Sequence, residues 1–193
     1  MTADVDRGDV VATERFSIAD DETAFSLNAR CYEAALASFP VVAAALAARE
    51  LPTAPQPSGE HRMFKRHDRP ARLIDPGLPA RVAERNVRAL DVGRRIANTV
   101  GAVRWVLGNE SFVVDHAERQ DSSRDANPGA LVALSADGAR IATTEGDLVV
   151  KALSTPEGAA VDVVEVMRRR VLTRRAPEAQ ENDGRNDPRP IET

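Results

Sequence analysis

The segment at residues 103–153 constrains the fold most, because its apolar residues recur at every second position in short runs. A Gly-Asn pair at 108–109 separates the first two runs, as in a short hairpin, and Gly138 and Gly146 mark later turns. This periodicity predicts five short β-strands. Tight turns between the strands, with a longer loop at residues 119–128, favour a small closed barrel over an open sheet.

Two helices are expected to flank these strands. In residues 79–91, apolar side chains recur every three to four positions after Pro79. Residues 161–175 have the same spacing and end in arginines, whose positive charge suits the negative C-terminal end of a helix dipole. The apolar positions expected to face the strands are Ala83, Val87, Leu90, Val164, Met167 and Val171. Trp105 lies in the alternating run of the first strand and is expected in the core.

The N-terminal part predicts a strand at residues 9–18 followed by a long amphipathic helix. Asp20 or Asp21 can cap this helix, and Glu22 places negative charge against the positive end of the dipole. Pro40 is expected to kink or restart the helix, because proline lacks the backbone donor and clashes with the preceding turn.

Leu27, Cys31 and Ala34 form the apolar stripe of this helix, so Cys31 is interpreted as a small buried residue rather than a nucleophile. A single strand cannot bury one face of a long helix. The helix at residues 22–49 therefore either packs on a partner, such as a second copy of the chain, or is exposed.

Prolines between residues 51 and 78 exclude a continuous helix and indicate an extended linker, while residues 176–193 are polar and are expected to be disordered. The predicted organisation has four parts. Residues 1–50 carry the strand and helix, 51–78 the linker, 79–175 the barrel with its helices, and 176–193 the tail. The predicted fold class is α+β.

Composition excludes several classes of protein. Cys31 is the single cysteine, so an internal disulfide and a cysteine-based zinc site are excluded and a reducing, cytoplasmic setting is expected. The net charge of −4, from 26 basic and 30 acidic residues, does not favour nucleic acid as a partner. The longest apolar run, at residues 39–48, is about half of the ~20 residues that span a bilayer, so no membrane segment is expected.

The order of motifs resembles the methionyl-tRNA formyltransferase and sugar N-formyltransferase family. DRGDVVATERFSI followed by DDETAFSL resembles the end of its catalytic domain, and VRALD resembles its first C-terminal helix. The run NPGALVALSADGARIATTEGDLVVKAL, with its Pro-Gly and Gly-Asp turns, resembles its C-terminal domain. The resemblance implies a remnant of a Rossmann-like catalytic domain followed by an OB-like barrel. RALDVGRRIANTVG is closer to the sugar and secondary-metabolite enzymes than to those that act on tRNA.

The resemblance also implies a formyl donor and a catalytic trio. Family members bind 10-formyltetrahydrofolate and use an Asn-x-His pair with an Asp, because amine attack on the formyl carbon needs a base and an oxyanion donor. Asp6 matches that Asp. No Asn-x-His occurs, since the residues two positions before His61, His67 and His116 are Gly59, Lys65 and Val114.

Three hypotheses follow. The chain is an N-terminally truncated formyltransferase that is inactive and binds no folate alone, or a subunit complemented by a separate N-terminal half, or a free-standing OB-like module that binds an acceptor, carrier or RNA. Whether the chain is an enzyme stays open. Asp6 could be a live catalytic carboxylate, but without its partners the interpretation as an exposed acid near a terminus is favoured.

Three local patterns have simpler interpretations. His61 and His67 lack a recognised zinc spacing and fit a solvated basic linker, so no metal site is expected. Phe64, among basic residues of the same linker, can stack on a base, but solvation is favoured. The arginines near residue 170 fit the end of a helix better than a phosphate site.

Overall fold

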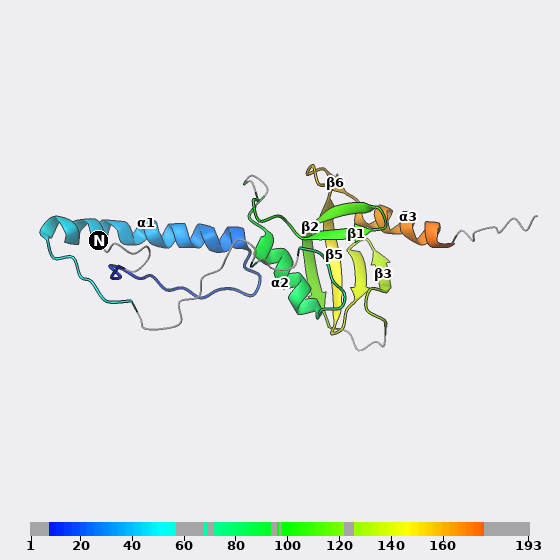
Figure 1. Ribbon diagram of the computed structural model, residues 1–193, viewed down its shortest axis with the longest axis horizontal. Helices are drawn as coiled ribbons and strands as arrows, with labels where there is room; N and C mark the ends of the chain where they lie inside the picture. The colour runs from blue at the N-terminus through cyan, green and yellow to red at the C-terminus, as the bar shows by residue number, and fades with distance from the viewer. Residues whose placement is uncertain are drawn as a thin grey trace, which may run out of the picture.

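The computed structural model describes residues 8–56, 68, 72–93, 96, 98–121 and 126–175. A long N-terminal helix extends from one side of an antiparallel sheet that carries two shorter helices (Figure 1). The mixed helix and sheet content confirms the α+β class. Asp6, His61, His67 and the tail lie outside the described residues.

The sheet has six antiparallel strands in the order β1-β2-β5-β4-β3, and β6 pairs with β5. Their bounds are β1 Arg104–Leu107, β2 Glu110–Gln120, β3 Leu131–Ser135, β4 Gly138–Ala142, β5 Asp147–Ser154 and β6 Ala160–Val161. The five predicted strands are confirmed, and the short β6 adds a sixth. Gly138 is required at the β3–β4 turn, because its φ is +126° and an added Cβ would lie 2.2 Å from the carbonyl oxygen of Val150.

The expected closure into a barrel is not found within residues 98–121 and 126–175. β1 and β3 end the ladder, and no pairing joins them in that part of the chain. The free edge of β1 is instead covered by the linker, where Leu73 forms a parallel bridge to Arg104. The Ile74 amide donates to the Arg104 carbonyl and the Arg104 amide donates to the Arg72 carbonyl, each at 2.8 Å. A covered edge has satisfied backbone groups without closure.

The hydrophobic core lies between the sheet and two helices, α2 (Ala80–Leu90) and α3 (Val163–Arg175). The predicted face of α2 is confirmed, since Ala83, Val87 and Leu90 are buried. Trp105 is 7% exposed and belongs to the same core. Arg140, on β4, and the buried Asp147, at the start of β5, form an ion pair at 2.5 Å.

The buried face of α3 agrees with the prediction at Met167 and differs from it at Val164. Val163, Val166 and Met167 are buried, whereas Val164 is only partly covered. The side chain of Val171 lies outside the described part. Both stripes have helical spacing, and the contacts of α3 with β3, β4 and β5 select the one that includes Val163.

The long helix α1 comprises Ala24–Ala48 and begins differently from the prediction. Thr23, rather than Asp20 or Asp21, is its N-cap, and Thr23 and Ser26 form a reciprocal capping box. The helix also continues through Pro40 as one element. The proline removes one internal hydrogen bond, and the surface of α1 lets water satisfy the freed carbonyl.

The predicted strand at residues 9–18 is not formed. Only Val10 pairs, in an isolated antiparallel bridge with Ala54, through hydrogen bonds of 2.7 and 2.9 Å. The Arg30 guanidinium lies 4.5 Å from the ring centre of Phe16 and ties this segment to α1. The backbone N–H and C=O groups of a strand need hydrogen-bond partners on a neighbouring strand. Among the described residues this segment has a single bridge, so it does not form a strand.

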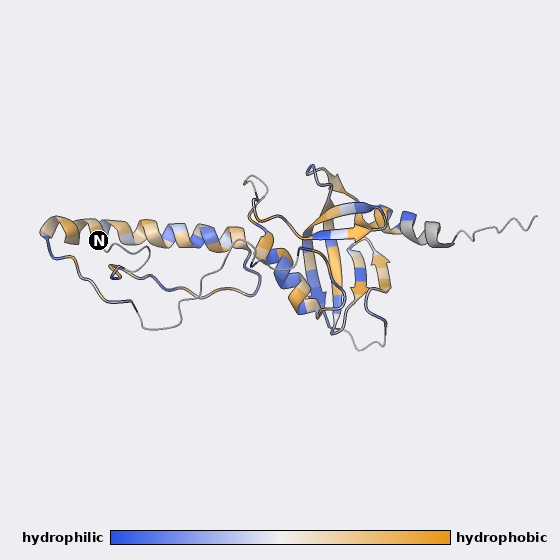
Figure 2. Ribbon diagram, viewed as in Figure 1, coloured by the Kyte–Doolittle hydropathy of each residue, from blue (hydrophilic) through white to orange (hydrophobic). Residues whose placement is uncertain are grey.

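None of the residues of α1 is buried. Hydrophobic residues nevertheless occupy much of its length (Figure 2). The predicted buried stripe is therefore wrong within the described chain, and Cys31 is an exposed free thiol. We define the α1 apolar surface by its large exposed side chains, which are Tyr32, Leu36, Phe39, Val41 and Leu46. By length and composition alone, α1 is long and apolar enough to cross a membrane, as core helices of soluble proteins also are.

Candidate functional site

The start of α1 is attached to the end of α2 by a small set of contacts that we call the α1–α2 joint. It consists of Glu22, Phe25, Arg88, Asp91 and Gly93. The Phe25 amide donates to the Asp91 carbonyl at 2.8 Å, and Arg88 Nη1 donates to the Glu22 carbonyl at 2.7 Å. Two backbone carbonyls thus accept hydrogen bonds across the joint. These bonds fix where α1 leaves the sheet domain, by which we mean the six strands together with α2 and α3.

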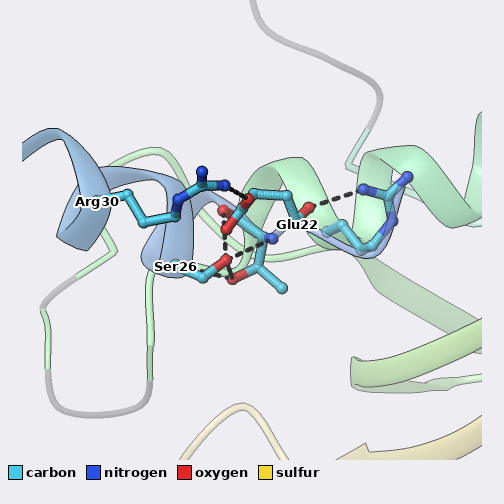
Figure 3. A network of polar contacts seen from close by, with 5 residues as sticks. Glu22, Ser26 and Arg30 are labelled. Atoms are coloured by element: carbon cyan, nitrogen blue, oxygen red, sulfur yellow. Dashed lines mark hydrogen bonds and ion pairs between the residues drawn. The ribbon is translucent and has the colours of Figure 1, made fainter. Parts of the chain in front are cut away.

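Side chains reinforce the joint on both helices. Arg88 forms an ion pair with Glu84 one turn earlier on α2. Arg30 Nη1 lies 2.6 Å from Glu22 Oε2, and Figure 3 shows this contact. Hydrogen bonds from the side chains of Ser26 and Arg30 lower the pKa of Glu22 below its ordinary value. Glu22 therefore stays ionised at neutral pH and holds Arg30 in place.

Gly93 lets the Phe25 ring lie on the loop after α2. Its φ is +85°, and an added Cβ would lie 2.7 Å from Cδ2 of Phe25. Any larger residue would have both a strained backbone and a clash with the ring. Asp91 supports this turn, since its carboxylate accepts a hydrogen bond from the Gly93 amide at 2.9 Å.

A cavity of about 570 Å³ lies beneath the joint. Its walls come from the start of α1, the end of α2, the loop up to Val103, the middle of β2 and the segment after β5. The volume is in the range of small-molecule sites, about 300–1,000 Å³. Phe25, Leu90, Ile96 and Val103 supply apolar wall.

The polar end of the cavity is formed where β2 departs from regular pairing. The ladder with β5 shifts register between Val114 and His116, and Asp115 is the residue left out of the pairing. Such a bulge re-aims side chains, which is why bulges are frequent at binding sites. Here Asp115 lines the cavity with one carboxylate oxygen buried, and its other oxygen accepts a hydrogen bond from Ser154 Oγ at 3.2 Å.

Of the three histidines, the structure describes His116, which lines the cavity. Its Nε2 lies 3.1 Å from Glu118 Oε1, and Lys151 Nζ lies 2.6 Å from the other carboxylate oxygen. Hydrogen bonds from Lys151, and then from His116, lower the pKa of Glu118. This group is an exposed ion-pair network on the sheet surface, where such pairs contribute little stability.

Sequence reasoning did not identify Asp115 or Ser154. A signal was present, because strict alternation after Phe112 and Val114 would place His116 in the core, whereas the next buried residue is Ala117. A polar pair that breaks alternation indicates a bulge. Within the described residues no group of three or more acidic, His or Cys side chains is placed to hold a metal.

No family model matches the sequence. The chain is similar in fold to HypX from Aquifex aeolicus. A multiply substituted HypX variant superposes with a TM-score of 0.61 at 15% identity, over 89% of this chain and 30% of HypX. HypX in complex with tetrahydrofolic acid superposes with a TM-score of 0.54 at 15% identity, over 88% of this chain and 29% of HypX. The chain thus spans about 30% of the HypX structures that it matches, and at this identity the likeness concerns the fold.

Proposed function

We propose that the chain is the C-terminal portion of a 10-formyltetrahydrofolate-dependent N-formyltransferase, that it transfers no formyl group alone, and that α1 docks it onto a catalytic portion. The observation that carries this proposal is the α1 apolar surface. Tyr32, Leu36, Phe39 and Val41 are strongly exposed, with values of 66%, 73%, 67% and 72%. Tyr32, Leu36 and Phe39 recur every three to four positions and so share one face of α1, and exposed apolar faces of this kind mark interaction surfaces.

The fold comparison supports a protein portion as the occupant of that surface. HypX contains this fold as about 30% of a longer chain, and one HypX structure holds tetrahydrofolic acid. The segment at residues 9–18 has a single bridge as its pairing and therefore still has backbone groups that an incoming sheet can bind. A strand and helix that pack on the rest of a catalytic domain would bury both features.

The chemistry of the described residues supports inactivity of the chain alone. Formyl transfer to an amine needs a proton acceptor beside an oxyanion donor. His116 lines the cavity, but its Nε2 lies 3.1 Å from Glu118 Oε1 on the sheet surface, so the imidazole is engaged in an ion-pair network. The Asn-x-His pair implied by the family resemblance is absent from the sequence. In this proposal the catalytic portion supplies it and Asp6 completes the trio.

The experiment measures turnover of 10-formyltetrahydrofolate with amino-sugar and aminoacyl acceptors. The chain is assayed alone and after co-expression with the polypeptide encoded immediately upstream, where that polypeptide carries an Asn-x-His. We expect no turnover by the chain alone, and turnover with the added portion that is lost in Asp6→Ala. Turnover by the chain alone that disappears in Asp6→Ala would contradict the proposal.

The docking surface has its own test in the self-association of the chain. Alone, the chain is expected to form oligomers through the α1 apolar surface, and the double variant Leu36→Asp, Phe39→Asp is expected to be monomeric, as measured by sedimentation velocity. Val106→Asp is the matched control, because Val106 is also an exposed apolar residue but belongs to β1. A monomeric parent chain, or equal effects of both sets of substitutions, would contradict a docking role for α1.

A further inference from the structure

We propose that the α1–α2 joint is a latch that opens while both parts of the chain stay folded. Closed, the latch holds the start of α1 against the sheet domain. Open, it leaves α1 attached to the sheet domain through the polypeptide chain. Two observations support a latch: the contacts across the joint are few, and each part is held together by contacts of its own. The latch is a property of the chain alone, whereas its effect on a docked partner rests on the proposed function.

Few contacts cross the joint within the described residues. The Phe25 amide donates to the Asp91 carbonyl at 2.8 Å. Arg88 Nη1 donates to the Glu22 carbonyl at 2.7 Å. The Phe25 ring lies on Gly93 but remains 49% exposed, so its release uncovers little apolar surface. Beyond the joint, α1 extends away from the sheet (Figure 1). A small set of contacts therefore decides whether α1 is held.

The N-terminal part keeps its own contacts when the latch opens. α1 has 25 residues, more than the ~12–15 below which an isolated helix is marginal. Thr23 and Ser26 close its capping box without the sheet domain. Val10 and Ala54 join the segments on either side of the helix by two backbone hydrogen bonds. The fold of this part therefore does not depend on α2.

The sheet domain is likewise complete without α1. Its buried hydrophobic residues come from the strands, α2, α3 and Val103, and within the described residues none belongs to α1. The chain before α2 is bound to the same domain, since the Thr144 amide donates to the Pro76 carbonyl at 3.2 Å. The Ala80 amide donates to the Glu145 carbonyl at 2.9 Å. Opening of the joint therefore removes no residue from the core.

The strengths of these contacts favour a closed latch with a minor open state. Arg88 is a charged donor, and hydrogen bonds from charged donors are roughly twice as strong as neutral ones. Together with one amide hydrogen bond and a half-exposed ring, this bond makes closure favourable. The core of the sheet domain is far larger, so the joint opens more often than the domain unfolds. Two conformations that differ by a few contacts of this kind leave an open population of about 0.1–10%.

For the proposed function, the latch determines how a docked catalytic portion is placed. With the latch closed, a portion bound to the α1 apolar surface has one orientation relative to the sheet domain, because the joint holds the first turn of α1. Reacting groups displaced by ~1 Å can react about a hundredfold more slowly. The closed latch is therefore the state expected during formyl transfer.

Amide hydrogen exchange on the full chain tests whether the joint opens by itself. The Phe25 amide should exchange faster than the amides of β5, and Arg88→Met should speed its exchange by at least about tenfold. The Ser26 amide, which belongs to the capping box, should be unchanged, because α1 itself stays folded. Arg85→Met is the matched control, since Arg85 is an exposed residue of α2 outside the joint. Exchange of Phe25 at the rate of β5, or no effect of Arg88→Met, would overturn the proposal.

Distance measurements follow the position of α1 directly. Spin labels at Ala47→Cys, near the end of α1, and Asp137→Cys, in the β3–β4 turn, are measured by double electron–electron resonance, with Cys31→Ser to remove the native thiol. Excess unlabelled chain excludes distances between two copies. We expect one main distance in the parent chain and a broad distribution after the further double substitution Phe25→Ala, Arg88→Met. A broad distribution in the parent chain, or one main distance in the double variant, would overturn the proposal.

Trp105 reports whether each variant keeps its fold. It is the single tryptophan and lies in the core of the sheet domain, so its fluorescence should stay native in every variant. If the double variant unfolds, the exchange rates of the parent chain decide, since Phe25 and β5 then either differ or agree. Neither measurement involves folate or a second polypeptide. A chain that transfers no formyl group can still have the latch, so the latch and the proposed function fail independently.

Discussion

Helix α2 has 11 residues and buries four of them, whereas α1 has 25 residues and buries none, although α1 is the more apolar helix. The difference lies in what faces each helix. α2 packs on β2 and β5, whereas in the part of the chain that the structure describes α1 meets α2 near its start, at the joint. Apolar composition makes burial favourable, and a facing surface is needed to realise it.

The two helices also differ in how their charged residues are used. On α2, Arg88 binds both Glu84 on its own helix and the Glu22 carbonyl across the joint. On α1, charged contacts occur near the start, where Arg30 meets Glu22 and the ring of Phe16. The joint therefore concentrates the specific contacts between the two regions, and the remaining length of α1 has few of them within the described chain.

Hydrogen exchange should show the largest difference between the two regions. At a concentration where the chain is monomeric, the amides of β5 should exchange only on global unfolding, because β5 is central in the sheet. The amides of residues 37–48 in α1 should exchange roughly a hundredfold faster or more, since few buried contacts hold them. Equal slow exchange in both regions would mean that α1 is part of the cooperative core.

Truncation of single side chains should show the next largest difference. Leu148→Ala removes a side chain with 0% exposure from the centre of the core and should lower the free energy of unfolding by about 2–5 kcal/mol. Leu36→Ala makes the same chemical change at a residue that is 73% exposed and should change it by about 0.5 kcal/mol or less. Urea denaturation measures both, and similar losses would contradict the comparison.

Acidification should show the smallest effect, confined to the joint. The pKa of Glu22 is lowered in the folded chain, so its contribution to stability is present above the unfolded pKa of about 4.3. It is lost as the pH falls through the folded value, because protonation removes the hydrogen bonds with Ser26 and Arg30. The exchange rate of the Phe25 amide should rise over that interval while the amides of β5 are unchanged.

Glu22→Gln tests the source of this acid response. The variant should remove the pH dependence of Phe25 exchange, and Glu33→Gln, an exposed acid on the same helix, should leave it intact. A response that persists in Glu22→Gln would assign it to another acid at the joint.

The sequence by itself determined the regular part of the sheet domain. Alternation and glycine turns predicted β1 to β5, and the spacing of Ala83, Val87 and Leu90 predicted the buried face of α2. These predictions succeeded because each depends on neighbours close in sequence, where hairpin and helix periodicity decide the conformation.

Tertiary structure decided the features that depend on distant neighbours. The segment at residues 9–18 has strand-like residues, but among the described residues it pairs with Ala54 alone. Contacts with the sheet selected the buried face of α3. Register between β2 and β5 produced the bulge that turns Asp115 into the cavity. Strand pairing and burial both require a second surface. A local sequence pattern indicates that a residue is suited to such a surface, but whether the surface is present depends on residues distant in the sequence.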